Sequence, residues 1–139
     1  MDEKDKIIVL SLLSNGRIPK TKLAELLGIT EAAVRKRIAK LESEGIIVGY
    51  RAIINYRTAK LAASLTGIDV EPEKIWNVIE KLKEIEGVKQ LWLTSGDHTI
   101  MAEIIAENTE ELSEIHRRIE EIEGVKRICP SVIIDTLKR

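Results

Sequence analysis

One segment constrains the fold of this chain more than any other: residues 21–50, which read TKLAELLGITEAAVRKRIAKLESEGIIVGY. Leu23, Leu26 and Leu27 recur at helical spacing and predict a short helix with one apolar face. Gly28 follows the last of these leucines, and a glycine there supplies the left-handed backbone that a sharp turn between helices requires. The segment therefore predicts two helices joined by a tight turn.

The second of these helices is predicted to begin after Thr30. The hydroxyl of Thr30 can accept a hydrogen bond from an amide in the first turn, and Glu31 suits the positive end of the helix dipole. Residues at i, i+4 and i+7 predict the buried face, which consists of Val34, Ile38 and Leu41. The outward face then combines small residues with cations: Ala32, Ala33, Arg35, Lys36, Ala39 and Lys40.

Such an outward face suits the major groove of DNA. Small side chains let the helix backbone enter a groove about 12 Å wide, while arginine and lysine reach guanine edges or phosphates. Cations on a helix can also serve only to solvate it, and this alternative stays open when the helix is considered alone. The residues expected to contact DNA are Thr30, Glu31, Ala32, Ala33, Arg35, Lys36, Arg37 and Lys40.

The cations of this helix are expected to have different roles. Arg35 and Lys36, early in the helix, are expected at or beside base edges. Arg37 and Lys40 are expected to hold phosphates, or to brace the helix through Glu42 or Glu44. The helix is therefore the candidate recognition element.

The flanking segments predict the remaining parts of a winged helix-turn-helix domain. Ile7, Leu10 and Leu13 form a helical stripe that predicts a third helix before the turn. Residues 46–50 and 52–54 are two short β-type runs separated by a turn, which predicts a wing. The four pieces together favour a DNA reader over a merely solvated helix.

Charge is distributed unevenly along the chain. The whole chain carries 22 basic and 23 acidic residues, which says nothing about nucleic acid. Residues 1–60 hold 12 lysines and arginines against 7 acidic residues, a net charge of +5, whereas residues 61–139 have a net charge of −6. A cationic first half is attracted to phosphates and an acidic second half is repelled, so we expect the second half to point away from DNA.

The second half contains an internal repeat. The hexapeptide EIEGVK occurs at residues 84–89 and again at residues 121–126, an offset of 37 residues. Helical stripes precede both copies at the same offset: Ile75, Val78, Leu82 and Ile85 in the first, and Leu112, Ile115, Ile119 and Ile122 in the second. Each copy is expected to run from a helix through a glycine into a strand.

Four strands are predicted around these two helices. They are expected at Ala62–Val70, Val88–Thr94, Thr99–Ala106 and Val125–Ile134, with Gly96-Asp97 as the hairpin turn and Pro130 at an edge or bulge. The order βαββαβ is that of a ferredoxin-like domain. The fold class is therefore α+β, with a winged helix-turn-helix at residues 1–50, a β-linker at 51–60, and a ferredoxin-like effector and dimerisation domain at 61–139.

A ferredoxin-like domain leaves one face of its sheet without helices. The predicted strand at residues 99–106 is apolar on both sides apart from Glu103. A domain of roughly 75 residues buries only about 60% of its unfolded surface, so we expect a second copy to cover the bare face in an obligate dimer. A sheet that stacks RNA would present aromatic residues, and this chain has no Phe, two Trp and two Tyr.

Taken together, the motifs resemble the Lrp/AsnC family of transcription regulators, over nearly the whole chain. The matching segments are DEKDKIIVLSLLSNGRIP, LAELLGIT, VRKRIAKLESEGII, GYRAIIN and LTSGDHTIMAEI. The resemblance implies a DNA-binding regulator that forms dimers, assembles further, often into octamers, and responds to a small-molecule effector, commonly an amino acid. Architectural DNA binding without an effector is the alternative.

The resemblance also implies where an effector would bind. In the family, ligands lie between dimers near the loop joining the second and third strands, which corresponds here to Ser95, Gly96, Asp97, His98 and Thr99. Amides of such a turn can hold a carboxylate, and Asp97 can pair with an ammonium group. Many members have a second aspartate where this chain has Thr99. A plain β-turn without a ligand is the competing interpretation.

Catalysis, metals, cofactors and membranes are not expected. Relatives of the family include sirohaem decarboxylases, but His98 and His116 are the only histidines, are expected on the surface, and lie in different segments. No metal-ligand spacing or nucleophile motif appears. Cys129, the sole cysteine, is expected to pack as a small apolar residue in a reducing cytoplasm. No signal peptide or membrane span is apparent.

The expected mode of action is binding to a roughly palindromic operator. Two recognition helices of a dimer would enter half-sites one helical turn apart, about 34 Å, or a multiple of that distance.

Overall fold

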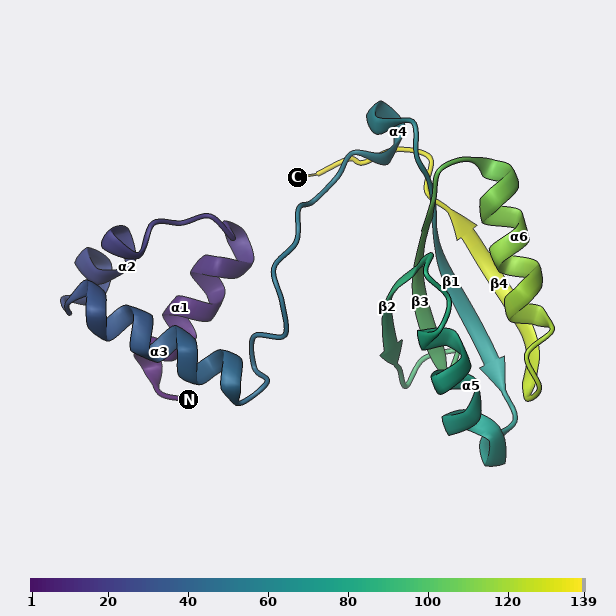
Figure 1. Ribbon diagram of the computed structural model, residues 1–139, viewed down its shortest axis with the longest axis horizontal. Coiled ribbons are helices and arrows are strands. Elements are labelled where there is room, and N and C mark those ends of the chain that lie inside the picture. Colours follow the sequence, from purple (N-terminus) through teal and green to yellow (C-terminus); the bar gives the residue numbers. More distant parts are fainter. Residues whose placement is uncertain (139) are drawn as a thin grey trace. The chain divides into compact units, whose positions relative to one another are not determined.

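The computed structural model describes residues 1–138, which divide into one compact unit at Met1–Ile53 and a second from Ile54 onward. The first unit contains three helices, α1 (Glu3–Ser14), α2 (Lys20–Leu27) and α3 (Glu31–Ser43). The second contains a four-stranded sheet with two main helices (Figure 1). Within the described residues, no helix is both long and apolar enough to cross a bilayer.

The three helices of the first unit enclose a small apolar core. Its fully or almost fully buried members are Ile8, Leu23, Ala24, Val34, Ile38 and Leu41. The predicted buried face of α3 is thus confirmed. On α2, Leu23 is buried and Leu27 is half-buried, but Leu26 is 63% exposed. The turn after α2 forms as predicted, with Gly28 in the left-handed conformation at φ 66°.

The buried face of α1 differs from the predicted one. Ile7, Leu10 and Leu13 are exposed, whereas Ile8 is buried and Leu12 is half-buried against the same core. The helix is apolar around most of its circumference, so spacing alone did not identify the buried side. The expected stripe was therefore wrong, although the helix itself was correctly predicted.

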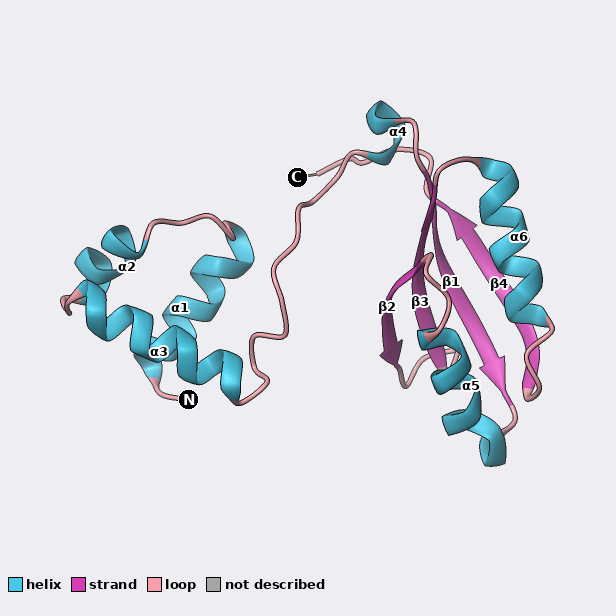
Figure 2. Cartoon of the chain, in the orientation of Figure 1, coloured by secondary structure: helices cyan, strands magenta, loops and turns pink. Residues whose placement is uncertain are grey.

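The predicted wing strands and β-linker are absent from the described structure. Figure 2 shows the chain from the end of α3 to α4 (Tyr56–Ala59) as loop. Val48 is 86% exposed and Ile53 is 79% exposed, and only Ile47 of the first run is half-buried against the core of the first unit. Isolated two-stranded hairpins are marginal in water. The β-type composition of residues 46–54 was therefore not enough to form strands in a single chain.

The second unit has the predicted βαββαβ order. Its strands are β1 (Ala62–Val70), β2 (Val88–Leu93), β3 (Ile100–Ala106) and β4 (Val125–Val132). The main helices are α5 (Ile75–Lys83), preceded by the 3-10 turn η1 (Pro72–Lys74), and α6 (Thr109–Glu120). The strands lie in the order β2-β3-β1-β4 and pair antiparallel. β1 matches its predicted bounds, while the other three strands are one or two residues shorter than predicted.

Both helices cover one face of the sheet, because every second strand residue points toward them. Ile68, Ile100, Ala102 and Ile104 form one core with the predicted helix stripes, including Val78 and Leu82 of α5 and Leu112, Ile115 and Ile119 of α6. The intervening residues point to the opposite side, where no helix lies within the described unit. We call this side the open face.

Candidate DNA-binding and effector sites

The outward side of α3 presents the residues expected to contact DNA. Ala32, Arg35, Lys36 and Lys40 are exposed, as is the preceding Thr30. Glu31, Ala33 and Arg37 are half-buried. Because the opposite side of α3 packs into the core, the small residues and three of the cations occupy one accessible surface.

The start of α3 is fixed by its cap. The side-chain oxygen of Thr30 accepts a hydrogen bond from the amide of Ala33 at 3.1 Å. The backbone N–H of Ile29 donates to the carbonyl of Ala24 in α2, so the turn is tied to the end of α2. The cap and the Gly28 turn therefore set the position of the first turn of α3. In a recognition helix, the residues of this first turn contact the base edges.

The cations of α3 differ in their partners. Arg35 pairs with Glu31 one turn earlier, and Lys40 lies 3.9 Å from Glu44. Within residues 1–138, Lys36 forms no ion pair. Lys36 is therefore the cation on this surface that is most directly accessible to an anion.

Arg37 has a structural partner that the sequence did not indicate. Its guanidinium donates to both carboxylate oxygens of Asp2, at 2.9 and 2.7 Å, and to Asp5 at 3.0 Å. The hydrogen bond from Arg37 is the main cause that lowers the pKa of Asp2 from 3.8 to about 2. Arg37 therefore braces α3 against α1, and not through Glu42 or Glu44 as expected.

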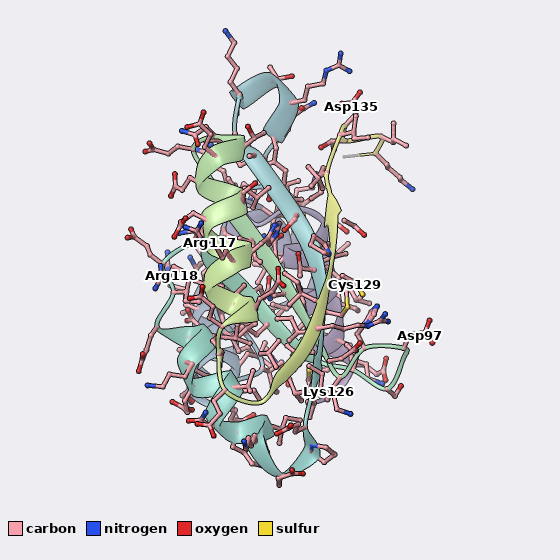
Figure 3. All side chains as sticks on the ribbon, turned by 90° about the vertical axis from the view of Figure 1, so that its right-hand side faces the viewer. Asp97, Arg117, Arg118, Lys126, Cys129 and Asp135 are labelled. Carbon is pink, nitrogen blue, oxygen red and sulfur yellow. The ribbon has the colours of Figure 1, made fainter. Side chains whose placement is uncertain are left out.

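The expected effector loop connects β2 to β3. Thr94 and Thr99 close it with a backbone hydrogen bond of 2.9 Å, so the connection is longer than the two-residue turn expected at Gly96-Asp97. Ser95, Gly96 and Asp97 are exposed, and His98 and Thr99 are half-buried. Figure 3 shows Asp97 on the side of the sheet away from α6.

His98 folds back from this loop onto the open face. One ring nitrogen, Nδ1, lies 2.9 Å from Asp69 of β1, and the other carboxylate oxygen of Asp69 accepts from Arg127 of β4 at 2.8 Å. These bonds, that from Arg127 first, hold the pKa of Asp69 below its usual value. His98 was expected on the surface, and its packing against the sheet is a correction.

Gly67 makes this position of His98 possible. A Cβ at Gly67 would overlap the imidazole ring, so the ring occupies the space that a side chain on β1 would fill. The glycine signal was visible in the sequence, but only the fold shows what approaches it.

His116, the second histidine, lies between α6 and the sheet. Its Nε2 is 2.8 Å from the hydroxyl of Ser64 and 3.3 Å from that of Thr66, and both hydroxyls are fully buried. Burial lowers the pKa of His116 below 6.5. The helix-surface position expected for His116 was therefore wrong. Ser64 and Thr66 alternate in phase with Ile68, which is the sequence signal that they point inward.

A small cavity of about 170 Å³ lies elsewhere, between α5 and the β2 edge. Its lining is mainly apolar: Ile79, Lys83, Leu91, Trp92, Leu93 and Ile100. None of the five residues expected to bind an effector lines it.

Two family models match the chain. Residues 1–48 match a winged helix-turn-helix DNA-binding model, and residues 64–139 match the Lrp/AsnC ligand binding domain. The chain is 49% identical, over 99% of its length and 99% of the relative's, to the HTH-type transcriptional regulator LrpA of Pyrococcus abyssi. A Pyrococcus horikoshii regulator of the same name is also 49% identical, with the same coverage.

A solved structure supports the same assignment. The leucine response regulatory protein LrpA of Mycobacterium tuberculosis is 27% identical and superposes with a TM-score of 0.78, covering 100% of this chain and 96% of that one. The α3 surface, the βαββαβ unit and these matches identify the chain: it is a DNA-binding transcription regulator that belongs to the Lrp/AsnC family.

Proposed function

We propose that this regulator binds a roughly palindromic operator in double-stranded DNA as a homodimer, through α3. The observation that carries the proposal is the exposed surface on which Ala32, Arg35 and Lys36 follow the cap at Thr30. Small residues permit close approach to the groove and cations reach bases or phosphates. Glu31, Ala33 and Lys40 complete the proposed contacts, while Arg37 acts by bracing the helix.

The partners of Arg35 and Lys36 give these cations different roles. Lys36 forms no ion pair within the described residues, so it can bind a phosphate without first breaking an existing ion pair. Arg35 must release or share Glu31 to reach a guanine, and the i,i+4 carboxylate also limits the directions in which the guanidinium points. We therefore assign base selection to Arg35 and non-specific affinity mainly to Lys36 and Lys40.

Footprinting together with a salt titration tests DNA recognition. A local regulator protects a defined site, and its binding constant falls steeply and linearly with salt on logarithmic axes, because cations displace counterions. An architectural protein would protect DNA with little preference for sequence, and that result would overturn the proposal of a specific operator.

The homodimer is proposed on the open face. Leu65 and Trp92 are 42% and 41% exposed there, and Met101 and Ile105 are half-buried beside them. A second copy packed sheet to sheet would bury all four. The family resemblance adds the expectation that dimers assemble further, into particles such as octamers.

Sedimentation equilibrium of a matched pair of variants tests this interface. Trp92→Glu places a charge on the open face, whereas Trp76→Glu alters an exposed tryptophan of α5. Wild type and Trp76→Glu should have the mass of two chains or a multiple, and Trp92→Glu should shift toward one. A monomeric wild type, or equal behaviour of both variants, would contradict the interface.

We further propose that the loop formed by Ser95, Gly96, Asp97, His98 and Thr99 binds an amino-acid effector. Three of its residues are exposed, and the Asp97 carboxylate can pair with an ammonium group. A ligand that binds only the native state raises the melting temperature. A thermal-shift screen of the standard amino acids should give a positive shift that Asp97→Asn abolishes; a screen without any shift would argue against an effector of this class.

A further inference from the structure

A cluster of three different donor side chains occupies the open face of the sheet. Asp69 of β1, His98 of the β2–β3 loop and Cys129 of β4 are all half-buried. One potential ligand atom from each lies within 4.8 Å of the other two. Figure 3 shows Cys129 and Asp97 on the same side of the sheet, opposite α6.

The sheet register explains why these residues meet. Cys129 is directly paired with Gly67, and Asp69 is directly paired with Arg127. Because residues two apart on a strand share a face, Cys129 and Asp69 both point to the open side. The ring of His98 lies over Gly67 and so beside Cys129. The glycine thus admits the third donor into the space between the other two.

We propose that Asp69, His98 and Cys129 form a binding site for a zinc-like divalent metal ion. Carboxylate, imidazole and thiolate together are the ligand types that Zn²⁺ takes, and three protein ligands leave a fourth position for water or another group. Thiolate and imidazole also disfavour Mg²⁺ and Ca²⁺, which take oxygen ligands.

The site needs only a small adjustment to close around a metal. Bonds of about 2.0–2.3 Å in a tetrahedral arrangement place ligand atoms roughly 3.3–3.8 Å apart. The donor atoms lie within 4.8 Å of one another, so no separation has to shrink by more than about 1.5 Å, and the 2.9 Å hydrogen bond between His98 and Asp69 must open slightly. Half-buried side chains can make such changes without moving the strands.

Arg127 serves this site as a positioning residue. It holds Oδ2 of Asp69 at 2.8 Å, while Oδ1 faces His98. One carboxylate oxygen of Asp69 would therefore stay bonded to the guanidinium while the other faces the metal. Hydrogen-bond partners that do not themselves contact the metal commonly orient its ligands in this way.

Cobalt(II) titration of the purified full-length chain tests the proposal. Tetrahedral Co²⁺ bound to a thiolate gives intense visible bands and a ligand-to-metal charge-transfer band, and Zn²⁺ should displace it. We expect one Co²⁺ per chain. Cys129→Ser should remove the charge-transfer band, and His98→Gln and Asp69→Asn should each weaken binding at least tenfold. Arg127→Gln should weaken it by about 10–100-fold without removing the band.

Glu86→Gln is the matched control, because it removes an exposed carboxylate of the second unit outside the cluster and should leave the titration unchanged. Circular dichroism spectra recorded in the presence of a chelator verify that each variant is folded. If Cys129→Ser does not fold, Cys129→Ala is used in its place. Absence of a charge-transfer band in the wild type, a weak octahedral spectrum, or equal binding by His98→Gln and wild type would overturn the site.

Discussion

Arg37 of α3 holds Asp2, the N-cap of α1, by two hydrogen bonds of 2.9 and 2.7 Å. The carboxylate of Asp2 also accepts a hydrogen bond from the amide of Asp5, and the carboxylate of Asp5 accepts one from the amide of Asp2, which completes a capping box. One carboxylate thus caps α1 and anchors α3. A cation on the candidate recognition helix therefore joins α3 to α1, while Lys36 beside it has no ion pair within the described residues.

Acid should weaken the three-helix unit through Asp2. Its pKa is about 2 in the folded state against an ordinary 3.8, so the stabilisation is complete above 3.8 and is lost as the pH falls from 3.8 through about 2. Thermal unfolding between those pH values should show less acid sensitivity in Asp2→Asn, which retains a capping side chain but not the charge. Glu3→Gln, at an exposed neighbour, should behave as wild type; equal slopes for Asp2→Asn and wild type would refute the assignment.

His116 should make the second unit sensitive to mild acid. Its folded pKa lies below 6.5 because burial opposes the charged ring, although Glu120 acts in the opposite direction and the facing hydroxyls of Ser64 and Thr66 are neutral. The stabilisation is therefore complete above pH 6.5 and declines as the pH falls below that value. Denaturant unfolding of wild type should show this decline, and His116→Gln should show a flatter profile. An unchanged profile in the variant would exclude His116 as its origin.

Gly67→Ala should destabilise the sheet by about 1–3 kcal/mol, because the added methyl group overlaps the His98 ring. The same substitution in a His98→Ala background should cost much less, since the space is then vacant. A double-mutant cycle by urea unfolding measures this coupling. Additive effects of the two substitutions would mean that the ring does not restrict position 67.

Arg35→Ala should relax sequence preference at one operator position by roughly 1–3 kcal/mol, whereas Lys40→Ala should weaken binding to all sequences about equally. Competition binding against operators with single base changes separates the two effects. If Arg35→Ala kept the wild-type preference at every position, base selection would have to be assigned to other residues of α3.

Sequence patterns predicted the elements whose signals are local and unambiguous. β1 has its predicted bounds, and Val34, Ile38 and Leu41 are buried as their spacing indicated. Prediction failed on α1, where apolar residues surround the helix and more than one stripe is possible. It also failed at residues 46–54, because a strand needs a partner that β-type composition cannot supply.

The clusters on the sheet were not accessible to the same reasoning. Asp69, His98 and Cys129 come from two strands and a loop, and their meeting depends on sheet register and on the space above Gly67. Metal-binding motifs are recognised by ligands a few residues apart in the sequence, and Asp69, His98 and Cys129 are about 30 residues apart, so no motif indicates them. The expectation of no metal therefore came from local spacing alone.

Selection of binding sites from a randomised duplex library by the full-length protein tests whether the regulator recognises a specific operator. We expect enrichment of a roughly palindromic motif whose half-sites lie one helical turn apart, about 34 Å, or a multiple of that distance. We also expect Arg35→Ala to lose preference at symmetry-related positions. Failure to enrich any motif, together with no retention of duplex DNA at low salt, would contradict recognition of a specific operator.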